Sequence, residues 1–145
     1  MKRVPQLRDL SEDHHHGLVL ARKAKKAASG QEGSSGPEMW VEVEAVFKSV
    51  LEPHFAIEES FIGDALRAAG ESELAQRLAD EHEALRRFLM PRHRRTVDDL
   101  RHFGELLEQH IRFEERELFQ VAQDKLTSDE LDAVAKACHD RDGEK

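Results

Sequence analysis

The spacing of apolar residues is the feature of this 145-residue chain that most limits its fold. In four long segments, placing residues every 100° around a helix brings apolar residues together on one face. The four faces comprise Leu7, Leu10, Leu18 and Ala21; Trp40, Val43, Phe47, Phe61 and Ala65; Leu74, Leu78, Leu85 and Leu89; and Phe103, Leu107, Leu118 and Val121. No sustained two-residue alternation is bounded by turn signals, so we expect helices and no strands.

Glycine, proline and serine mark where these helices should end. We expect helices over residues 5–28, 38–69, 72–90 and 96–124, and a short C-terminal fifth helix over residues 128–140. Residues 29–37 read Ser-Gly-Gln-Glu-Gly-Ser-Ser-Gly-Pro, which predicts a flexible linker. Pro53 should kink the second helix, because its ring removes a backbone hydrogen bond. Helices of this length with short connections predict an all-α, antiparallel up-down four-helix bundle over residues 5–124, within a single domain of residues 1–145.

Composition and charge argue against several classes of partner. The net charge is −8, which argues against nucleic acid as the main partner. No stretch approaches the roughly 20 apolar residues that span a bilayer, and the N-terminus lacks the apolar core of a signal peptide. We therefore expect a cytoplasmic protein with no membrane partner, as a monomer or a homodimer. Cys138 is the single cysteine, so cysteine-rich metal sites and an intramolecular disulfide are excluded.

Ionisable residues fall on the apolar faces of all four long helices. Such positions face the core of a bundle, where an unpaired imidazolium or carboxylate costs several kcal/mol. The inward-facing set is His14, His54, Glu58, His82, His110 and Glu114. Because every helix accepts this cost near its middle, we expect a shared compensating partner, and a bound cation is the simplest one. The alternative is a set of buried ion pairs in a helical interaction module without metal.

Two pairs in this set share the spacing His-x-x-x-Glu. The four-residue step of His54/Glu58 and of His110/Glu114 places imidazole and carboxylate one helical turn apart, so both side chains reach one metal centre. The spacing gains its weight from the position of both pairs on core faces. Nitrogen and oxygen ligands from four helices, without thiolate, favour iron or manganese over a structural zinc site.

Four segments of the chain carry a family resemblance. They read Asp-His-His-His at 13–16, Pro-His-Phe-Ala-Ile-Glu-Glu at 53–59, Asp-Glu-His-Glu-Ala-Leu at 80–85 and His-Ile-Arg-Phe-Glu-Glu-Arg-Glu-Leu-Phe at 110–119. In this order they resemble hemerythrin-like domains, above all the His-His-Glu (HHE) cation-binding branch. The second and fourth segments are the specific ones, and the resemblance spans residues 5–124.

The resemblance implies a di-iron centre inside the bundle, bridged by an oxo or hydroxo group, with manganese or zinc as substitutes. It assigns ligands by position: His54, His82 and His110 as terminal ligands, and Glu58 and Glu114 as bridges between the two ions. The ligand from the first helix is His14 or His15, and the family motif leaves both open. The apolar face favours His14, because His15 is rotated about 100° away from it.

Two departures from the family pattern bear on function. Hemerythrins that carry oxygen reversibly have a second histidine one turn after the third-helix ligand, where this chain has Arg86. They also use an aspartate five residues after the fourth-helix histidine, whereas Glu114 comes after four and Glu115 takes the fifth place. Each iron would then keep open positions for a small exogenous ligand, which argues against simple oxygen transport.

The function we favour from the sequence is a non-haem di-iron protein that binds or senses O2, NO or peroxide. The alternatives are a di-iron peroxidase, a catalase-like or NO-reducing enzyme, and an iron-responsive interaction domain, so enzymatic activity stays open. Glu59 and Glu115 are expected to accept hydrogen bonds behind the ligands or to carry exposed charges. Among the other histidines, the surface positions expected are His16, His93 and His139, with His102 beside the core.

Overall fold

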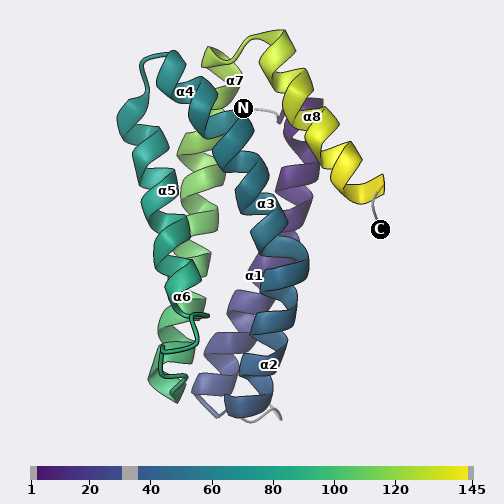
Figure 1. The fold of residues 1–145 in the computed structure, drawn as a ribbon. Coiled ribbons are helices and arrows are strands. Elements are labelled where there is room, and N and C mark those ends of the chain that lie inside the picture. Colours follow the sequence, from purple (N-terminus) through teal and green to yellow (C-terminus); the bar gives the residue numbers. More distant parts are fainter. Residues whose placement is uncertain (1–2, 31–35, 144–145) are drawn as a thin grey trace.

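The computed structural model describes residues 3–30 and 36–143, in which all regular secondary structure is helical. Four long helical stretches lie side by side, and a fifth helix packs along one end of them (Figure 1). The first stretch is η1 (Pro5–Leu7) with α1 (Arg8–Ala28). The second stretch comprises α2 (Gly36–Val46), η2 (Phe47–Leu51), α3 (Glu52–Ile57), η3 (Glu58–Gly63) and α4 (Asp64–Ala68), and the third is α5 (Ser72–Arg87). The fourth comprises α6 (Val97–Phe113), η4 (Glu114–Leu118) and α7 (Phe119–Lys125), and the fifth helix is α8 (Ser128–Gly143).

The helical class and the C-terminal fifth helix expected from the sequence are confirmed. Residues 31–35 of the expected linker lie outside the described residues, and Gly36 already belongs to α2. Gly30 and Gly70 follow helix ends with φ of 78° and 88°, values that a residue without Cβ adopts at no steric cost. The helices therefore end at these two positions because glycine adopts the positive φ there.

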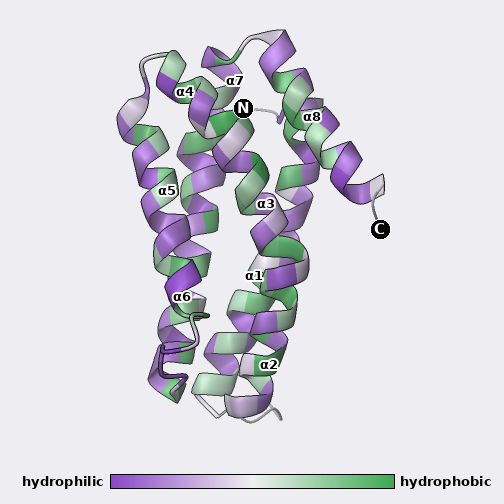
Figure 2. Ribbon diagram, in the orientation of Figure 1, coloured by the Kyte–Doolittle hydropathy of each residue, from purple (hydrophilic) through white to green (hydrophobic). Residues whose placement is uncertain are grey.

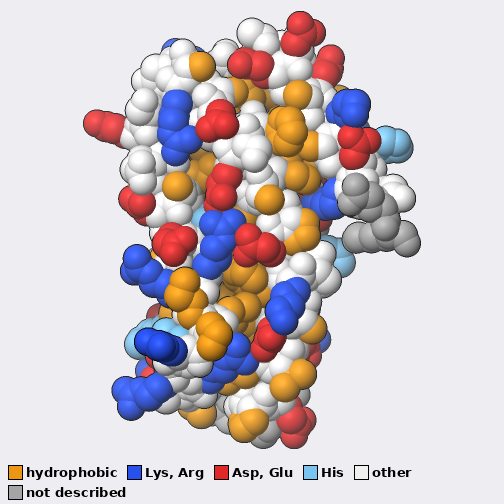
Figure 3. Space-filling model, in the orientation of Figure 1, with side chains coloured by type: hydrophobic (Ala, Val, Ile, Leu, Met, Phe, Trp, Pro, Cys, Tyr) orange, Lys and Arg blue, Asp and Glu red, His pale blue; other side chains and the backbone are white. Residues whose placement is uncertain are grey.

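Hydrophobic and hydrophilic residues alternate around every helix (Figure 2), and acidic and basic side chains are interspersed over the face drawn in Figure 3. None of the described helices has both the length and the apolar character needed to cross a bilayer. The buried apolar side chains form two clusters: one includes Leu10 and Phe119 and takes in part of α8, and the other includes Val43 and Phe103. On each long stretch the boundary between the clusters falls at the buried ionisable residues. The polar groups therefore form a layer between two apolar ones.

The prediction that Phe61 faces the core is wrong. This residue is 39% exposed, whereas its neighbour Ile62 is fully buried. The elements η2 and η3 are π turns, each of which widens the helix locally by accommodating an extra residue. A face drawn at a constant 3.6 residues per turn loses its phase after such turns, so Ile62 takes the core position.

The chain remains helical at Pro53, where the π turn η2 passes into the α-helix α3. The amide of Glu52 bonds to the carbonyl of Phe47, five residues back, and Pro53 lies in the first turn of α3. Proline has no N–H, so Pro53 donates no backbone hydrogen bond to this turn. The π turn η2 thus accommodates the proline that precedes the first site residue of this stretch.

The close approach of α1 and α6 at Gly104 yields a stability prediction. A Cβ on Gly104 would lie 2.8 Å from the carbonyl oxygen of Ala21, whereas a Cβ on Gly63 would meet nothing nearer than 3.6 Å. We expect Gly104→Ala to lower the free energy of unfolding by about 1–3 kcal/mol, because the backbone of α1 must move. Gly63→Ala, the matched control, should raise it by about 0.5–1 kcal/mol, since alanine is the better helix former.

Urea unfolding followed by circular dichroism measures both variants. A Gly104→Ala protein as stable as the Gly63→Ala protein would contradict the close packing of α1 on α6.

Candidate metal centre

Six buried ionisable side chains meet in the middle of the bundle. These central residues are His14 from α1, His54 from α3, Glu58 from η3, His82 from α5, His110 from α6 and Glu114 from η4. Each is at most 4% exposed. They are the six positions singled out in the sequence, and His15, the open alternative to His14, is exposed.

Glu114 contacts all four central histidines. Its Oε1 lies 2.5 Å from Nε2 of His14 and 3.3 Å from Nε2 of His54. Its Oε2 lies 2.6 Å from Nε2 of His110 and 3.3 Å from Nε2 of His82. One carboxylate therefore offers one oxygen to each pair of imidazoles, which is the arrangement of a bridging ligand.

Glu58 faces two of these imidazoles without forming hydrogen bonds to them. Its oxygens lie 3.0 Å from Nε2 of His54 and 3.1 Å from Nε2 of His82. Within the described part of the chain, neither Glu58 oxygen has an aligned hydrogen-bond partner, and the same holds for Nε2 of His110. Leaving a buried polar atom without a partner costs folding free energy. A cation placed among these nitrogen and oxygen atoms would give each of them a partner.

The central residues form two groups that share both glutamates. One group is His14, His54, Glu58 and Glu114, and the other is Glu58, His82, His110 and Glu114. Within each group the ligand atoms all lie within 4.8 Å of one another. The set of nitrogen and carboxylate oxygen donors fits two cations side by side, with no cysteine in either group.

The two glutamates occupy matching positions in the backbone. Glu58 is the first residue of the π turn η3, and Glu114 is the first residue of the π turn η4. π turns inside α-helices occur often at functional sites. Neither turn could be predicted from the apolar pattern, because a helical pattern of fixed period does not show a local widening.

A second layer of carboxylates holds the outer nitrogens of the central histidines. The bonds from Nδ1 run His14 to Glu115 at 2.6 Å, His54 to Asp13 at 3.0 Å, His82 to Glu59 at 2.7 Å and His110 to Glu81 at 2.6 Å. We call these four residues the outer carboxylates. A carboxylate on Nδ1 keeps the proton there, so the Nε2 lone pair of each imidazole faces the centre.

The outer carboxylates close a ring around the bundle. Each is the chain neighbour of a central residue, yet it binds the histidine of another helical stretch. Asp13 of the first stretch binds the second, Glu59 the third, Glu81 the fourth and Glu115 the first. Glu59 and Glu115 were predicted to lie behind the ligands, whereas Asp13 and Glu81 were not. The signal available for these two was that each is adjacent in sequence to a central residue.

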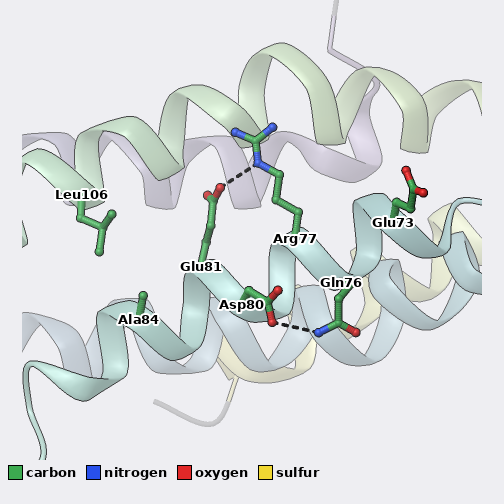
Figure 4. Close-up of a pocket in the computed structure, with 7 residues that line it drawn as sticks. All are labelled: Glu73, Gln76, Arg77, Asp80, Glu81, Ala84 and Leu106. Atoms are coloured by element: carbon green, nitrogen blue, oxygen red, sulfur yellow. Dashed lines mark hydrogen bonds and ion pairs between the residues drawn. The ribbon is translucent and has the colours of Figure 1, made fainter.

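Each outer carboxylate also binds an arginine, and we call these four the outer arginines. The N···O distances are 2.7 Å for Arg141–Asp13 and 2.8 Å for Arg86–Glu59, Arg77–Glu81 and Arg3–Glu115. Figure 4 shows Arg77 beside Glu81 in an open pocket between α5 and α6. Arg86 stands where the family resemblance leads us to expect a further histidine in oxygen carriers, and it also lies 2.8 Å from Glu52. Its guanidinium therefore contacts carboxylates outside the centre.

The charges of the metal-free centre shift its pKa values strongly. Burial lowers the pKa of His82, but the carboxylates of Glu114, Glu58 and Glu59 outweigh it and raise that pKa to about 10. Burial likewise raises the pKa of Glu115, but His14, Ser11 and Arg3 prevail and lower it to about 2. The His82 imidazole therefore carries a proton on both nitrogens at neutral pH when no metal is present.

The remaining histidines lie outside this centre. His16 and His139 are exposed. His102 is exposed as well, so the expectation that it lies beside the core is wrong. His93, expected at the surface, is partly buried with its ring 5.1 Å from that of Phe88.

A known protein family matches this sequence and site. The model of the hemerythrin HHE cation-binding domain matches residues 6–122. The chain belongs to the hemerythrin HHE family. Comparisons with curated proteins and with solved structures give no match. Membership in the HHE family indicates that the chain binds a metal cation, and the matched range contains all six central residues.

The shifted pKa values give the metal-free HHE domain a pH window of stability. A raised histidine pKa stabilises the fold fully below the unfolded value of 6.5, and this contribution is lost as the pH rises through about 10 for His82. The lowered pKa of Glu115 contributes fully above 4.5 and is lost as the pH falls towards about 2. We expect the Tm of chelator-treated protein to be highest between pH 4.5 and pH 6.5, the unfolded-state pKa values of Glu115 and His82. The Tm should then decrease as the pH rises towards about 9.

Two histidine variants provide the control for this pH dependence. His82→Gln should weaken the decline above pH 6.5, whereas His102→Gln at an exposed position should retain it. A wild-type Tm that stays constant or rises over this range would contradict the assignment.

Proposed function

We propose that this chain binds two iron ions between its central residues and that this centre binds or senses O2, NO or peroxide. The observation that carries the proposal is the sharing of Glu58 and Glu114 by two histidine pairs. Each position then has two imidazole nitrogens and an oxygen from each glutamate. The proposal includes the antiparallel up-down arrangement of the four long stretches that the sequence predicts.

The donor set supports iron as the metal. Imidazole and carboxylate donors without thiolate suit iron or manganese, and carboxylate-bridged pairs held by bundle helices are typical of di-iron proteins. When bound, an iron pair supplies reversible electron transfer and open coordination positions for a small ligand. Four protein donors at each position leave such positions free.

The protein side chains hold the centre rigid and separate it from water. The ring of Phe55 stacks on that of His82 with centroids 3.8 Å apart, and Phe119 stacks on His14 at 5.3 Å. Both phenylalanines are at most 1% exposed. With the outer carboxylates holding the Nδ1 protons, the imidazole rings are fixed in position before metal arrives, and Nε2 is the nitrogen whose proton a metal would replace.

The position of Arg86 favours an enzyme as the second candidate. Its guanidinium is held by Glu52 and Glu59, so no nitrogen donor fills the place where oxygen carriers of this family are expected to have a further histidine. A more open coordination sphere suits a peroxidase, a catalase-like enzyme or an NO-reducing enzyme.

Metal analysis of protein produced with iron and purified without chelator tests the proposal. We expect two irons per chain in the wild type. Glu114→Gln should lose most of both ions, because Glu114 serves both positions. Glu105→Gln is the matched control, since Glu105 lies exposed on α6, and it should keep both irons.

Circular dichroism shows whether Glu114→Gln retains its helices. A wild-type chain that binds no metal under these conditions, or a folded Glu114→Gln chain that binds as much as wild type, would contradict the proposal. The first outcome would favour a helical interaction module without metal.

Anaerobic stopped-flow absorption separates sensing from catalysis. We expect NO or peroxide to produce one stoichiometric spectral change per loaded chain, followed by no further consumption. Repeated turnover of peroxide or NO with a supplied reductant would instead support the enzyme.

A further inference from the structure

The outer arginines fall into two kinds according to where they come from. Arg77 and Arg86 lie on α5 and serve the His82 and His110 side of the centre. Arg3 precedes η1 and Arg141 lies on α8, and both serve the His14 and His54 side. Arg3 and Arg141 lie outside the matched range of residues 6–122. One half of the centre is therefore completed by segments that flank the family domain.

Arg3 contacts both groups that hold the His14 ring. Its Nη2 donates to Oε1 of Glu115 at 2.8 Å and to the Glu115 carbonyl at 3.0 Å. The other oxygen of Glu115 lies 2.6 Å from Nδ1 of His14 and accepts from Ser11 at 2.9 Å. The guanidinium also lies 5.1 Å from the ring of Phe119, which stacks on His14. Arg3 thus fixes the carboxylate behind His14 and the aromatic ring beside it.

Arg141 acts on His54 through a single shared oxygen. Its Nη1 donates to Oδ2 of Asp13 at 2.7 Å, and the same oxygen lies 3.0 Å from Nδ1 of His54. The Arg141 side chain is 16% exposed, so water screens this ion pair only partly. Removal of the guanidinium would leave Asp13 free to turn away from the imidazole.

The start of the matched range is joined to α8, and α8 is anchored in the core. Gln6, at the first matched position, donates to Asp132 of α8 at 3.1 Å. The inner face of α8 buries Leu131, Val134 and Cys138 in the cluster that also contains Leu7. Burial of these side chains holds α8 against the bundle, so Arg141 reaches Asp13 from a docked helix.

We propose that Arg3 and Arg141 are positioning residues that clamp one of the two metal positions, the one formed with His14 and His54. This inference rests on the proposed metal centre. The clamp makes that position depend on the docking of residues 3–7 and of α8, whereas the His82 and His110 position depends on α5. The two ions are therefore held unequally once the clamp is removed, and the ion at the clamped position leaves first.

The test compares metal release from Arg3→Gln, Arg141→Gln and the double variant with release from wild type. Each protein is loaded with iron, and release to excess chelator is followed together with iron per chain. Loss of a partner behind a ligand weakens metal binding by about 10- to 100-fold. We expect the double variant to release one ion faster by about this factor and to keep the second at the wild-type rate, with helicity unchanged. Mössbauer spectra should show one of two iron environments depleted.

Three further variants identify the position that is lost and the reason. Lys136→Gln removes an exposed ion pair with Asp140 on α8 and should leave both release rates unchanged. Arg141→Lys keeps a cation near Asp13 and should restore part of the retention. In the double variant from which chelator has removed the first ion, adding His54→Gln should cost no further ion, whereas adding His110→Gln should remove the second.

The outcomes separate this inference from the proposed function. A wild-type chain that binds no iron contradicts both. A wild-type chain with two ions, and a double variant that keeps both at wild-type rates or loses both together, overturns only the clamp.

Discussion

The burial of four imidazoles and two carboxylates at one level of the bundle is the constraint on which the rest of the structure depends. An unpaired buried charge costs several kcal/mol, so each of these groups needs partners on every side. The structure provides them in layers: glutamate oxygens face the Nε2 atoms, the outer carboxylates face the Nδ1 atoms, and arginines face the outer carboxylates. Alternating charge from the centre to the surface makes the polar layer compatible with apolar clusters above and below it.

The ring of outer carboxylates also fixes how the helices lie relative to one another. Because each helix binds the histidine of the next through the residue beside its own central residue, a shift of one helix by a single residue would break bonds at two neighbours. Apolar packing alone tolerates many such shifts, since leucine and phenylalanine contacts are not directional. Hydrogen bonds with fixed geometry therefore specify the register that brings the central residues together.

The sequence predicted those features that depend on a regular helical period. Helix existence followed from it, as did the inward placement of His14 rather than His15. Phe61 was misplaced because one π turn precedes it and a second contains it, and a constant rotation of 100° per residue cannot represent either turn. The links of Arg3 to Glu115 and Arg141 to Asp13 join positions more than 100 residues apart, so no local pattern contains them.

In the proposed metal centre, Arg86 links the openness of the coordination sphere to the support of a neighbouring ligand. In the sequence, Arg86 takes the place of an expected histidine ligand, which predicts a more open centre. In the structure its guanidinium binds Glu59, which orients His82, and it lies 5.6 Å from the ring of Phe55, which stacks on the same imidazole. The residue that fails to donate a nitrogen thus supports the neighbouring ligand from behind. Openness at this position does not require a loosely held metal, because the arginine that removes a donor also strengthens one that remains.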